Sequence, residues 1–274
     1  MPHASPTVAL GTAAEAPPIL SLRGVSKSYG GVNALVDVDL DVHRGDVLAI
    51  CGDNGAGKSS LIKIISGAQP PSSGTMTLRG EEAGFRSPHD ALQKGVATIY
   101  QDLALAPRLS IADNVFMGAE LTRSLGLPFI RLLDKARMRS EARRYLGRLS
   151  VDIADTRRPV EGLSGGQRQA VAISRALRWD AEIIIMDEPT AALGVRETAQ
   201  VLDLVRSLKA DGRTVILISH NMRDVVALAS RVVILSHGRK IVDRPVAGLE
   251  ADDISHMIMT GAANGEGGLA AKRA

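Results

Sequence analysis

The chain has 274 residues, of which 45% are apolar, 23% charged and only 3% aromatic, and its formal net charge is +3. This length is enough for one large domain, or for a domain with a subdomain. The weak positive charge does not indicate a nucleic-acid partner, because no aromatic-studded basic groove accompanies it. The single cysteine, Cys51, excludes an internal disulfide and a cysteine-based zinc cluster. No apolar run reaches the roughly 18 residues of a membrane span, and no signal peptide is visible, so we expect a cytosolic or peripheral protein.

The predicted elements begin after an Ala- and Pro-rich stretch, residues 1–18, which we expect to be a disordered tail. Alternating apolar and polar residues then predict antiparallel strands, and strands are expected at Ile19–Arg23, Val38–Val42 and Thr75–Arg79. Uninterrupted apolar runs predict buried strands at Val47–Ile50 and Val96–Tyr100. The second of these leads directly to Gln101.

From Asp102 to about Asp180 the sequence shows no strand pattern, and its apolar residues recur with the period of a helix. The apolar segment Leu103–Met117 is either core or an exposed docking surface. We favour docking, because the segment directly follows Gln101. Further on, the patterns predict a buried strand that ends in acid at Glu182–Asp187, a helix, a buried strand at Thr214–Ile218, a hairpin around His237 and a short helix at Asp252–Met259.

These patterns divide the chain into three regions. Residues 1–18 are the tail, residues 19–250 the main domain, and residues 251–274 a C-terminal helix with a loose end. Within the main domain, residues 19–101 and 181–250 are expected to form a core with a β subdomain. Residues 102–180 are expected to form a helical subdomain.

A phosphate-binding loop is predicted at Gly52–Ser59, which fits the pattern G-x-x-x-x-G-K-[ST] between a buried strand and a helix. Glycines let the backbone curl so that N–H groups point at anionic oxygens, and the helix turns its positive end on the same phosphates. We expect Lys58 to reach the β- and γ-phosphates and the Ser59 hydroxyl to ligate Mg²⁺. The residues expected to bind the nucleotide here are Gly52, Asp53, Asn54, Gly55, Ala56, Gly57, Lys58, Ser59 and Ser60.

Two acids at the end of a buried strand supply the second half of a nucleotide site. Asp187 is expected to hold Mg²⁺, directly or through water. Glu188 is expected to position or deprotonate the attacking water. Tyr29 lies beside a flexible Gly pair and is either a ring that stacks on a purine base or a half-buried turn tyrosine, and position alone favours neither.

A second anion site is predicted where Leu163–Gln167 opens a helix, because Ser164 and the glycine N–H groups lie at the helix start. Two such loops, on separate subdomains that face the same way, cannot grip one ATP. We therefore expect two copies related head-to-tail by a two-fold axis. Each nucleotide would lie between the Gly52–Ser59 loop of one copy and, from the other copy, Ser164, Gly165, Gly166 and Gln167.

Five motifs in this order resemble the ATP-binding subunit of ABC transporters, over about residues 19–259: Gly52–Ser59, Gln101, Leu163–Gln167, Ile183–Glu188 and His220. The resemblance implies an α/β fold, with a RecA-like P-loop NTPase core, an antiparallel β subdomain and an inserted α-helical subdomain. It implies ATP hydrolysis coupled to dimer closure and to membrane partners. It also implies that Tyr29 stacks on adenine, that Gln101 ligates Mg²⁺ and senses the γ-phosphate, that Glu188 is the catalytic carboxylate, and that His220 contacts the γ-phosphate.

A finer resemblance is to the monosaccharide importers of bacteria, carried by Ile99–Ala104, Ser110–Asn114, Leu163–Ala170 and Pro189–Val195. One set of motifs makes the chain look most like the single-domain fructose importer type. The implied partners are a second copy, transmembrane permease subunits and, indirectly, a periplasmic sugar-binding protein, with no nucleic acid. The implied location is the cytoplasmic face of the bacterial inner membrane. An ABC importer for another small solute stays open, as does, less favoured, a soluble ABC ATPase.

One position departs from the family pattern. Where the broad family usually has Ser-Ala-Leu-Asp, this chain has Ala191-Ala192-Leu193-Gly194. In the family the aspartate normally hydrogen-bonds across the dimer. Gly194 removes no direct ligand of the nucleotide, but it removes a side chain that would help the two sites communicate.

Overall fold

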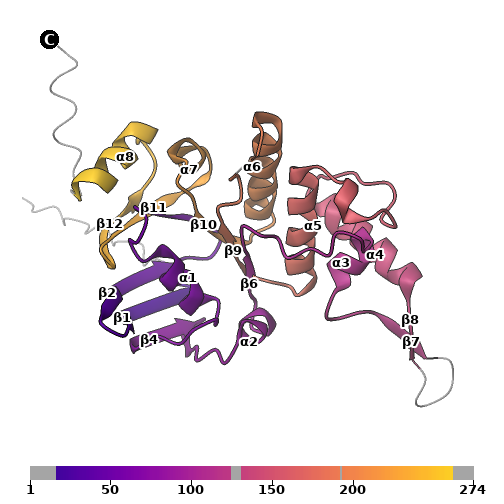
Figure 1. Ribbon diagram of the computed structural model, residues 1–274, viewed down its shortest axis with the longest axis horizontal. Helices are drawn as coiled ribbons and strands as arrows, with labels where there is room; N and C mark the ends of the chain where they lie inside the picture. The colour runs from indigo at the N-terminus through magenta and orange to yellow at the C-terminus, as the bar shows by residue number, and fades with distance from the viewer. Residues whose placement is uncertain (1–16, 125–130, 192, 262–274) are drawn as a thin grey trace, which may run out of the picture.

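The computed structural model describes residues 17–124, 131–191 and 193–261 of the chain. Figure 1 shows its parts in a row: an antiparallel sheet at one end, a second sheet with helices in the middle, and a group of helices at the other end. The predicted α/β fold, with an antiparallel β part and an inserted helical part, is confirmed.

The central sheet joins its strands in the order β12-β11-β3-β10-β9-β6. Strands β3, β6, β9, β10 and β11 run parallel, and β12 is antiparallel to β11. Strands β3, β9 and β10 are buried almost throughout, which explains their continuous apolar sequence. The bounds are β3 Val47–Cys51, β6 Val96–Ile99, β9 Ile183–Asp187, β10 Thr214–Ile218, β11 Arg231–Ser236 and β12 Arg239–Pro245.

The second sheet is antiparallel and has the order β2-β1-β4-β5. In β2, Val38 and Leu40 are buried whereas Asp37 and Asp39 are exposed. This alternation is the one predicted for a strand with one solvated face. The bounds are β1 Leu20–Tyr29, β2 Val32–Val42, β4 Ser73–Leu78 and β5 Glu81–Glu82.

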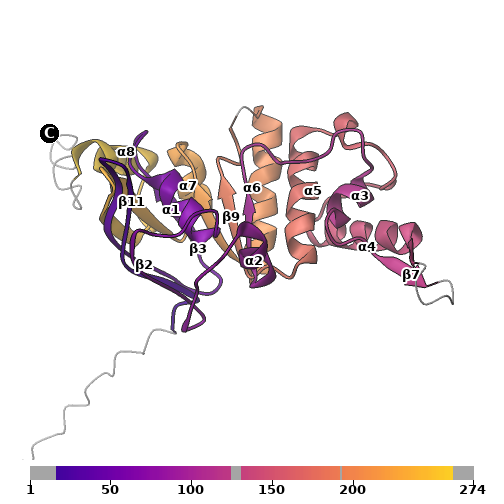
Figure 2. The ribbon, with the colours of Figure 1, turned by 60° about the horizontal axis from the view of Figure 1, so that its bottom comes forward.

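Side-chain caps set the starts of several helices. The Oγ atoms of Ser87 and Ser110 accept hydrogen bonds from the first turns of α2 and α3, and Asp134 does the same for α4. Figures 1 and 2 both show α6 between the central sheet and α5. The bounds are α1 Lys58–Ile65, α2 Pro88–Gln93, α3 Ile111–Phe116, α4 Lys135–Arg148, the 3₁₀ helix η1 Val160–Gly162, α5 Gly165–Arg178, α6 Val195–Ala210, α7 Met222–Leu228 and α8 Ala251–Thr260.

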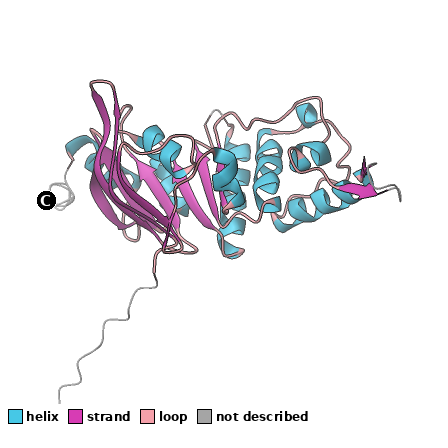
Figure 3. Cartoon of the chain, turned by 90° about the horizontal axis from the view of Figure 1, so that it is seen from below, coloured by secondary structure: helices cyan, strands magenta, loops and turns pink. Residues whose placement is uncertain are grey.

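The helical part contains a short hairpin that the sequence pattern did not predict. Strand β7 (Thr122–Ser124) pairs antiparallel with β8 (Arg131–Leu133), and Figure 3 shows the pair at the end remote from both sheets. The expectation that strands are absent between Asp102 and Asp180 is therefore wrong. Both strands are three residues long, and all their residues are exposed, so no alternation of apolar and polar residues marks them.

The apolar segment Leu103–Met117 divides into a partly exposed loop and a core helix. Helix α3 is largely buried in the main hydrophobic cluster, so the interpretation as a docking surface is wrong for this helix. Asn114, which is fully buried, holds the preceding loop, because its Nδ2 donates to the carbonyl groups of Ala106, Leu109 and Ser110.

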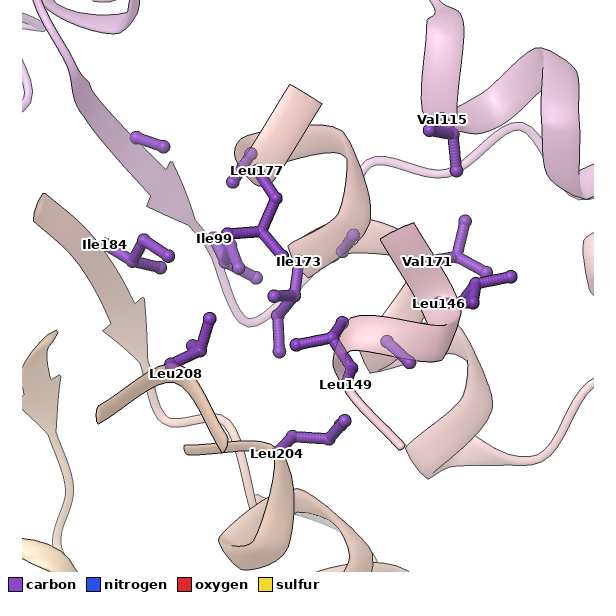
Figure 4. Packing of buried hydrophobic residues seen from close by; sticks show 14 of the residues in the cluster. Ile99, Val115, Leu146, Leu149, Val171, Ile173, Leu177, Ile184, Leu204 and Leu208 are labelled. Atoms are coloured by element: carbon purple, nitrogen blue, oxygen red, sulfur yellow. The ribbon is translucent and has the colours of Figure 1, made fainter. Parts of the chain in front are cut away.

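One hydrophobic cluster joins the central sheet to the helical part. In Figure 4 side chains from β6, β9, α4, α5 and α6 point toward one another around α5. Helix α5 is thus packed on the sheet side and on the outer side at once. The residues labelled in the figure are Ile99, Val115, Leu146, Leu149, Val171, Ile173, Leu177, Ile184, Leu204 and Leu208.

Cys51 is fully buried, as expected for a small apolar side chain. Burial raises the pKa of its thiol to about 12. Among the described helices, none is both long and apolar enough to cross a membrane. The predicted loose ends fall almost entirely outside the described residues, at 1–16 and 262–274.

Replacing Leu208, which is fully buried in the cluster, by alanine is expected to lower the free energy of unfolding by about 2–5 kcal/mol. The reason is that apolar contacts are lost and a cavity remains. Val195 begins the same helix and is 91% exposed, so Val195→Ala should change this free energy by less than about 0.5 kcal/mol. Urea unfolding followed by circular dichroism measures both, and equal stabilities would contradict the packing.

Candidate functional site

A hollow of about 610 Å³ brings together most of the residues predicted to bind a nucleotide. It lies at the edge where the parallel strands β3, β9 and β10 end, so segments far apart in the sequence meet there. The residues of the sequence prediction that line it are Tyr29, Asp53–Ser60, Gln101, Asp187, Glu188 and His220.

The loop between β3 and α1 requires glycine where it approaches other backbone. Gly52 has φ 144°, and an added Cβ would lie 2.3 Å from the carbonyl oxygen of Leu235 in β11. Gly57 has φ 105°, and its Cβ would lie 2.6 Å from the carbonyl oxygen of Ala34 in β2. Only glycine fits both the angles and the space. Gly52 does not itself line the hollow, but it fixes the loop that does.

Lys58 begins α1 and lies across the loop. Its Nζ donates to the carbonyl oxygens of Gly52 at 2.6 Å and Asp53 at 2.9 Å. The first-turn N–H groups of α1 also lie at this end of the hollow, so the helix adds its positive end to the lysine charge. The local field therefore favours an anion.

Glu188 and His220 contact each other, with 2.7 Å between Glu188 Oε2 and His220 Nδ1. The Glu188 side chain is 18% exposed and the His220 side chain 72% exposed. Glu188 has φ 50°, which is uncommon outside glycine. Its N–H donates to the carbonyl oxygen of Ile218 at 3.0 Å, so β10 holds the residue in this conformation. The sequence predicted that Glu188 acts on the attacking water, and the resemblance implied that His220 contacts the γ-phosphate, but neither predicted that the two side chains contact each other.

Asp187 is the last residue of β9 and pairs in register with Ile218. Burial raises the pKa of Asp187, the charge of Glu188 raises it further, and Lys58 opposes the shift. A partly buried carboxylate whose charge is so weakly compensated favours a nearby cation. Within the described residues, no group of three His, Cys, Asp or Glu side chains offers another metal site.

Tyr29 ends β1 at the rim of the hollow, with 42% of its surface exposed. Its hydroxyl is hydrogen-bonded to Oε1 of Gln69, and Lys27 Nζ lies 5.5 Å from the ring centroid. The ring therefore lies on the hollow and not in the core, which is the position that base stacking requires.

Gln101 lines the large hollow and also a neighbouring one of about 360 Å³, which lies between the ends of β6 and β9 and the start of α5. The chain beyond Gln101 is tied to α5 by Arg175. Its guanidinium donates to the carbonyl oxygens of Leu103 and Ala104, both at 3.0 Å. Arg175 thus links the segment that carries Gln101 to the helical part.

Ser164–Gln167 lies apart from the phosphate loop within the chain. None of these four residues is among the described residues that line the large hollow, although Gly165 lines the smaller hollow. Ser164 caps α5: its Oγ accepts from the Gln167 N–H at 3.3 Å, and the Gln167 side chain accepts from the Ser164 N–H at 3.1 Å. This capping box gives the loop a defined shape.

Sequence reasoning missed Val32, Asn33 and Ala34, which line the large hollow from β2. The available signal was their position directly after Tyr29 and its Gly pair, in the same hairpin. It also missed Asp224 of α7, which accepts a 2.7 Å hydrogen bond from Thr190 Oγ1 and so fixes the segment after Glu188.

The comparisons with known proteins agree with this geometry. The ABC transporter family profile matches residues 35–191. The fructose import ATP-binding protein FrcA of Rhizobium meliloti is 49% identical over 227 residues, covering 82% of this chain and 87% of that protein. The xylose/arabinose import ATP-binding protein XylG of Sulfolobus acidocaldarius is 43% identical over 255 residues, covering 93% and 99%. The ribose import ATP-binding protein RbsA 1 of Streptomyces coelicolor is 44% identical over 46% of its own length.

Solved structures share the fold. A nucleotide-free ATP-binding cassette from an ABC transporter is similar with a TM-score of 0.71 and 25% identity, over 83% of this chain and 91% of that one. A dimeric post-hydrolysis cassette bound to ADP and phosphate has a TM-score of 0.68 and 25% identity, over 84% and 100%. Together with the hollow and its phosphate loop, these findings show that the chain belongs to the ABC transporter family as an ATP-binding subunit.

Proposed function

We propose that this chain hydrolyses ATP to power the import of a monosaccharide through a membrane permease. The observation that carries the proposal is the large hollow, in which the phosphate loop, Asp187, Glu188 and His220 meet. The similar proteins FrcA and XylG are named for the import of fructose and of xylose or arabinose. Fructose is the finer proposal, because FrcA is more similar to this chain than XylG is, and another ABC importer substrate is its alternative.

In the proposed reaction Glu188 accepts a proton from water while the water oxygen bonds to the γ-phosphorus. The bond from the γ-phosphorus to the bridging oxygen breaks, and ADP leaves with that electron pair. His220, in contact with the Glu188 carboxylate, keeps it oriented. Lys58 and the loop N–H groups offset the charge on the phosphates.

The residues present fit a Mg²⁺ ion that accompanies ATP. Ser59, Gln101 and Asp187 line the same hollow and offer the oxygen ligands that Mg²⁺ prefers. The raised pKa of Asp187, caused first by burial, indicates a carboxylate that lacks a full counter-charge. When bound, Mg²⁺ would neutralise charge on the β- and γ-phosphate oxygens.

We further propose that two copies share each nucleotide head-to-tail. Ser164 lies outside the hollow that contains Lys58, so contact of both with one nucleotide requires a second copy. The ATP anion then attracts two positive loops and holds the copies together. Hydrolysis divides that charge between two products, and the dimer reopens.

A third hollow, of about 270 Å³, is proposed to receive a cytoplasmic segment of the permease. It is lined by His89 of α2, Tyr100 after β6, Met117 after α3 and Trp179 after α5. It therefore lies between the strand-rich and helical parts and next to Gln101, so a segment seated there contacts both parts. In this proposal the chain works at the cytoplasmic face of the bacterial inner membrane, and a periplasmic sugar-binding protein contacts only the permease.

Glu188→Gln is expected to bind ATP, to slow hydrolysis by roughly 10²–10⁴-fold through loss of the base, and to accumulate closed dimers. Phosphate release and light scattering with Mg²⁺-ATP measure both effects. Glu182→Gln is the matched control, because Glu182 adjoins the opposite end of β9, where it pairs with Arg44 and Arg79. Turnover of Glu188→Gln near that of the wild type would reject Glu188 as the base.

Asp187→Asn is expected to raise the Tm of the nucleotide-free protein at pH 7. Burial raises the folded-state pKa of Asp187 above its unfolded value, so the ionised carboxylate destabilises the fold at neutral pH. This penalty disappears as the pH falls below the unfolded pKa of about 3.9, so the gain in Tm should shrink toward acid pH. Thermal scans from pH 7 to about pH 4 measure it.

Asp243 provides a control of opposite sign. Burial raises its pKa, but hydrogen bonds from Arg231 and Lys240 outweigh burial and lower it. Asp243→Asn should therefore lower the Tm at pH 7, and that loss should stay constant down to about pH 4 and shrink only below the unfolded pKa of about 3.9, as acid protonates the wild-type carboxylate. The same sign for both variants would contradict the assigned electrostatics.

Trp179→Ala should reduce copurification of the permease while ATP-driven dimerisation in solution persists. The indole lines the third hollow, edge-on to His89 with ring centroids 5.6 Å apart. Leu133→Ala, on the exposed hairpin strand β8, is the control. Mass spectrometry of the captured proteins identifies the permease and any sugar-binding protein. Unchanged capture by Trp179→Ala would move the docking site elsewhere, and capture of ribosomes alone would favour a soluble ATPase.

A further inference from the structure

Glu197 holds the starts of two helices with one carboxylate. It lies in the first turn of α6, where its Oε2 accepts from the Gly194 N–H at 3.4 Å and so caps its own helix. Its Oε1 accepts from the Gly165 N–H at 2.9 Å, at the start of α5. The hydrogen bond from Gly165 joins residues 32 positions apart. The capping of α6 alone does not require this bond.

The two helix starts are also packed without spare room. A Cβ added to Gly165 would lie 2.6 Å from Leu193 Cδ2 and 3.2 Å from Glu197 Oε1. One added to Gly166 would lie 2.5 Å from Gln200 Oε1. Figures 1 and 2 show α5 and α6 side by side. The start of α5 therefore cannot shift toward α6 without displacing α6.

The bridge is a charged one. The Gly165 N–H lowers the pKa of Glu197 most, the Gly194 N–H lowers it further, burial opposes them slightly, and Arg168 adds its charge. The side chain is therefore ionised at neutral pH, with an acceptor oxygen for each helix. Both helix starts carry partial positive charge, which a carboxylate placed between them offsets.

From Gly194 a short series of contacts leads back to Glu188. The N–H of Leu193 donates to the carbonyl oxygen of Thr190 at 3.3 Å, and the N–H of Ala191 donates to that of Glu188 at 3.1 Å. Thr190 is fixed in turn by Asp224. These contacts tie Ala191 to Glu188, Leu193 to Thr190 and Thr190 to α7.

We propose that Glu197 is a positioning residue that couples the two nucleotide sites of the dimer. Within one copy it links Gly165, beside the nucleotide bound mainly by the partner, to the segment behind Glu188, which faces the copy's own nucleotide. Engagement of one nucleotide by the start of α5 thereby sets the position of Glu188 at the other. Both contacts of Glu197 lie within one copy, and the inference rests on the proposed head-to-tail dimer.

The rate of ATP hydrolysis by the purified full chain is measured against Mg²⁺-ATP concentration. The wild type should show a Hill coefficient above 1, with 2 as the limit for two sites. Glu197→Ala should bring it close to 1, because neither helix start is held. Glu197→Gln keeps one acceptor oxygen, so its Hill coefficient should lie between those of the wild type and Glu197→Ala. A purely steric role would not predict this intermediate value.

Asp253→Ala is the matched control, since the Asp253 carboxylate caps α8 in the same way by accepting from the Glu250 N–H at 2.8 Å. It should leave the Hill coefficient unchanged. An unchanged coefficient in Glu197→Ala, an equal fall in Asp253→Ala, or a wild-type coefficient of 1 would each overturn the inference. Dimer formation by Glu188→Gln with ATP is tested separately. Its failure would reject the proposed shared site, whereas dimers with an unchanged coefficient reject only the role of Glu197.

Discussion

The register of the central parallel sheet is the constraint on which the site depends. Ile218 of β10 lies opposite Ile50 of β3 on one side and Asp187 of β9 on the other. The residues that follow these strands therefore leave the sheet at one edge, and β6 delivers Gln101 beside them. Because these strands are buried on both faces, a slip in register would disrupt the core and the site together.

Two residues at that edge are held in energetically unfavourable states, and the rest of the molecule stabilises them there. Asp187 is held in a place that disfavours its charge, and Glu188 is held in a backbone conformation that few non-glycine residues adopt. Such features persist only where surrounding structure determines them. Here the hydrophobic clusters on the two faces of the central sheet provide this surrounding structure. Exposed ion pairs such as Arg23–Asp41 contribute little by comparison.

Much of this arrangement was predictable, because the key residues follow buried apolar runs, and the ends of parallel strands meet at one edge. The exposed β7–β8 hairpin was not, since strands of three residues show no pattern. The position of Ala34 in the hollow was not, because it depends on the close approach of β2 to Gly57 in the loop before α1. The contact of Glu197 with Gly165 was not, because it follows from how two helices pack. Local sequence thus predicts which groups reach the site, whereas tertiary packing decides which of them touch.

Cys51 has a practical consequence. It is the one cysteine of the sequence, and it is fully buried directly before the phosphate loop. Burial raises the pKa of its thiol to about 12, so the thiol stays protonated at neutral pH. A native protein of this kind presents almost no reactive thiolate to a maleimide dye. A cysteine introduced on an exposed surface would therefore be a unique attachment point for a fluorophore or spin label, with no need to remove the natural one.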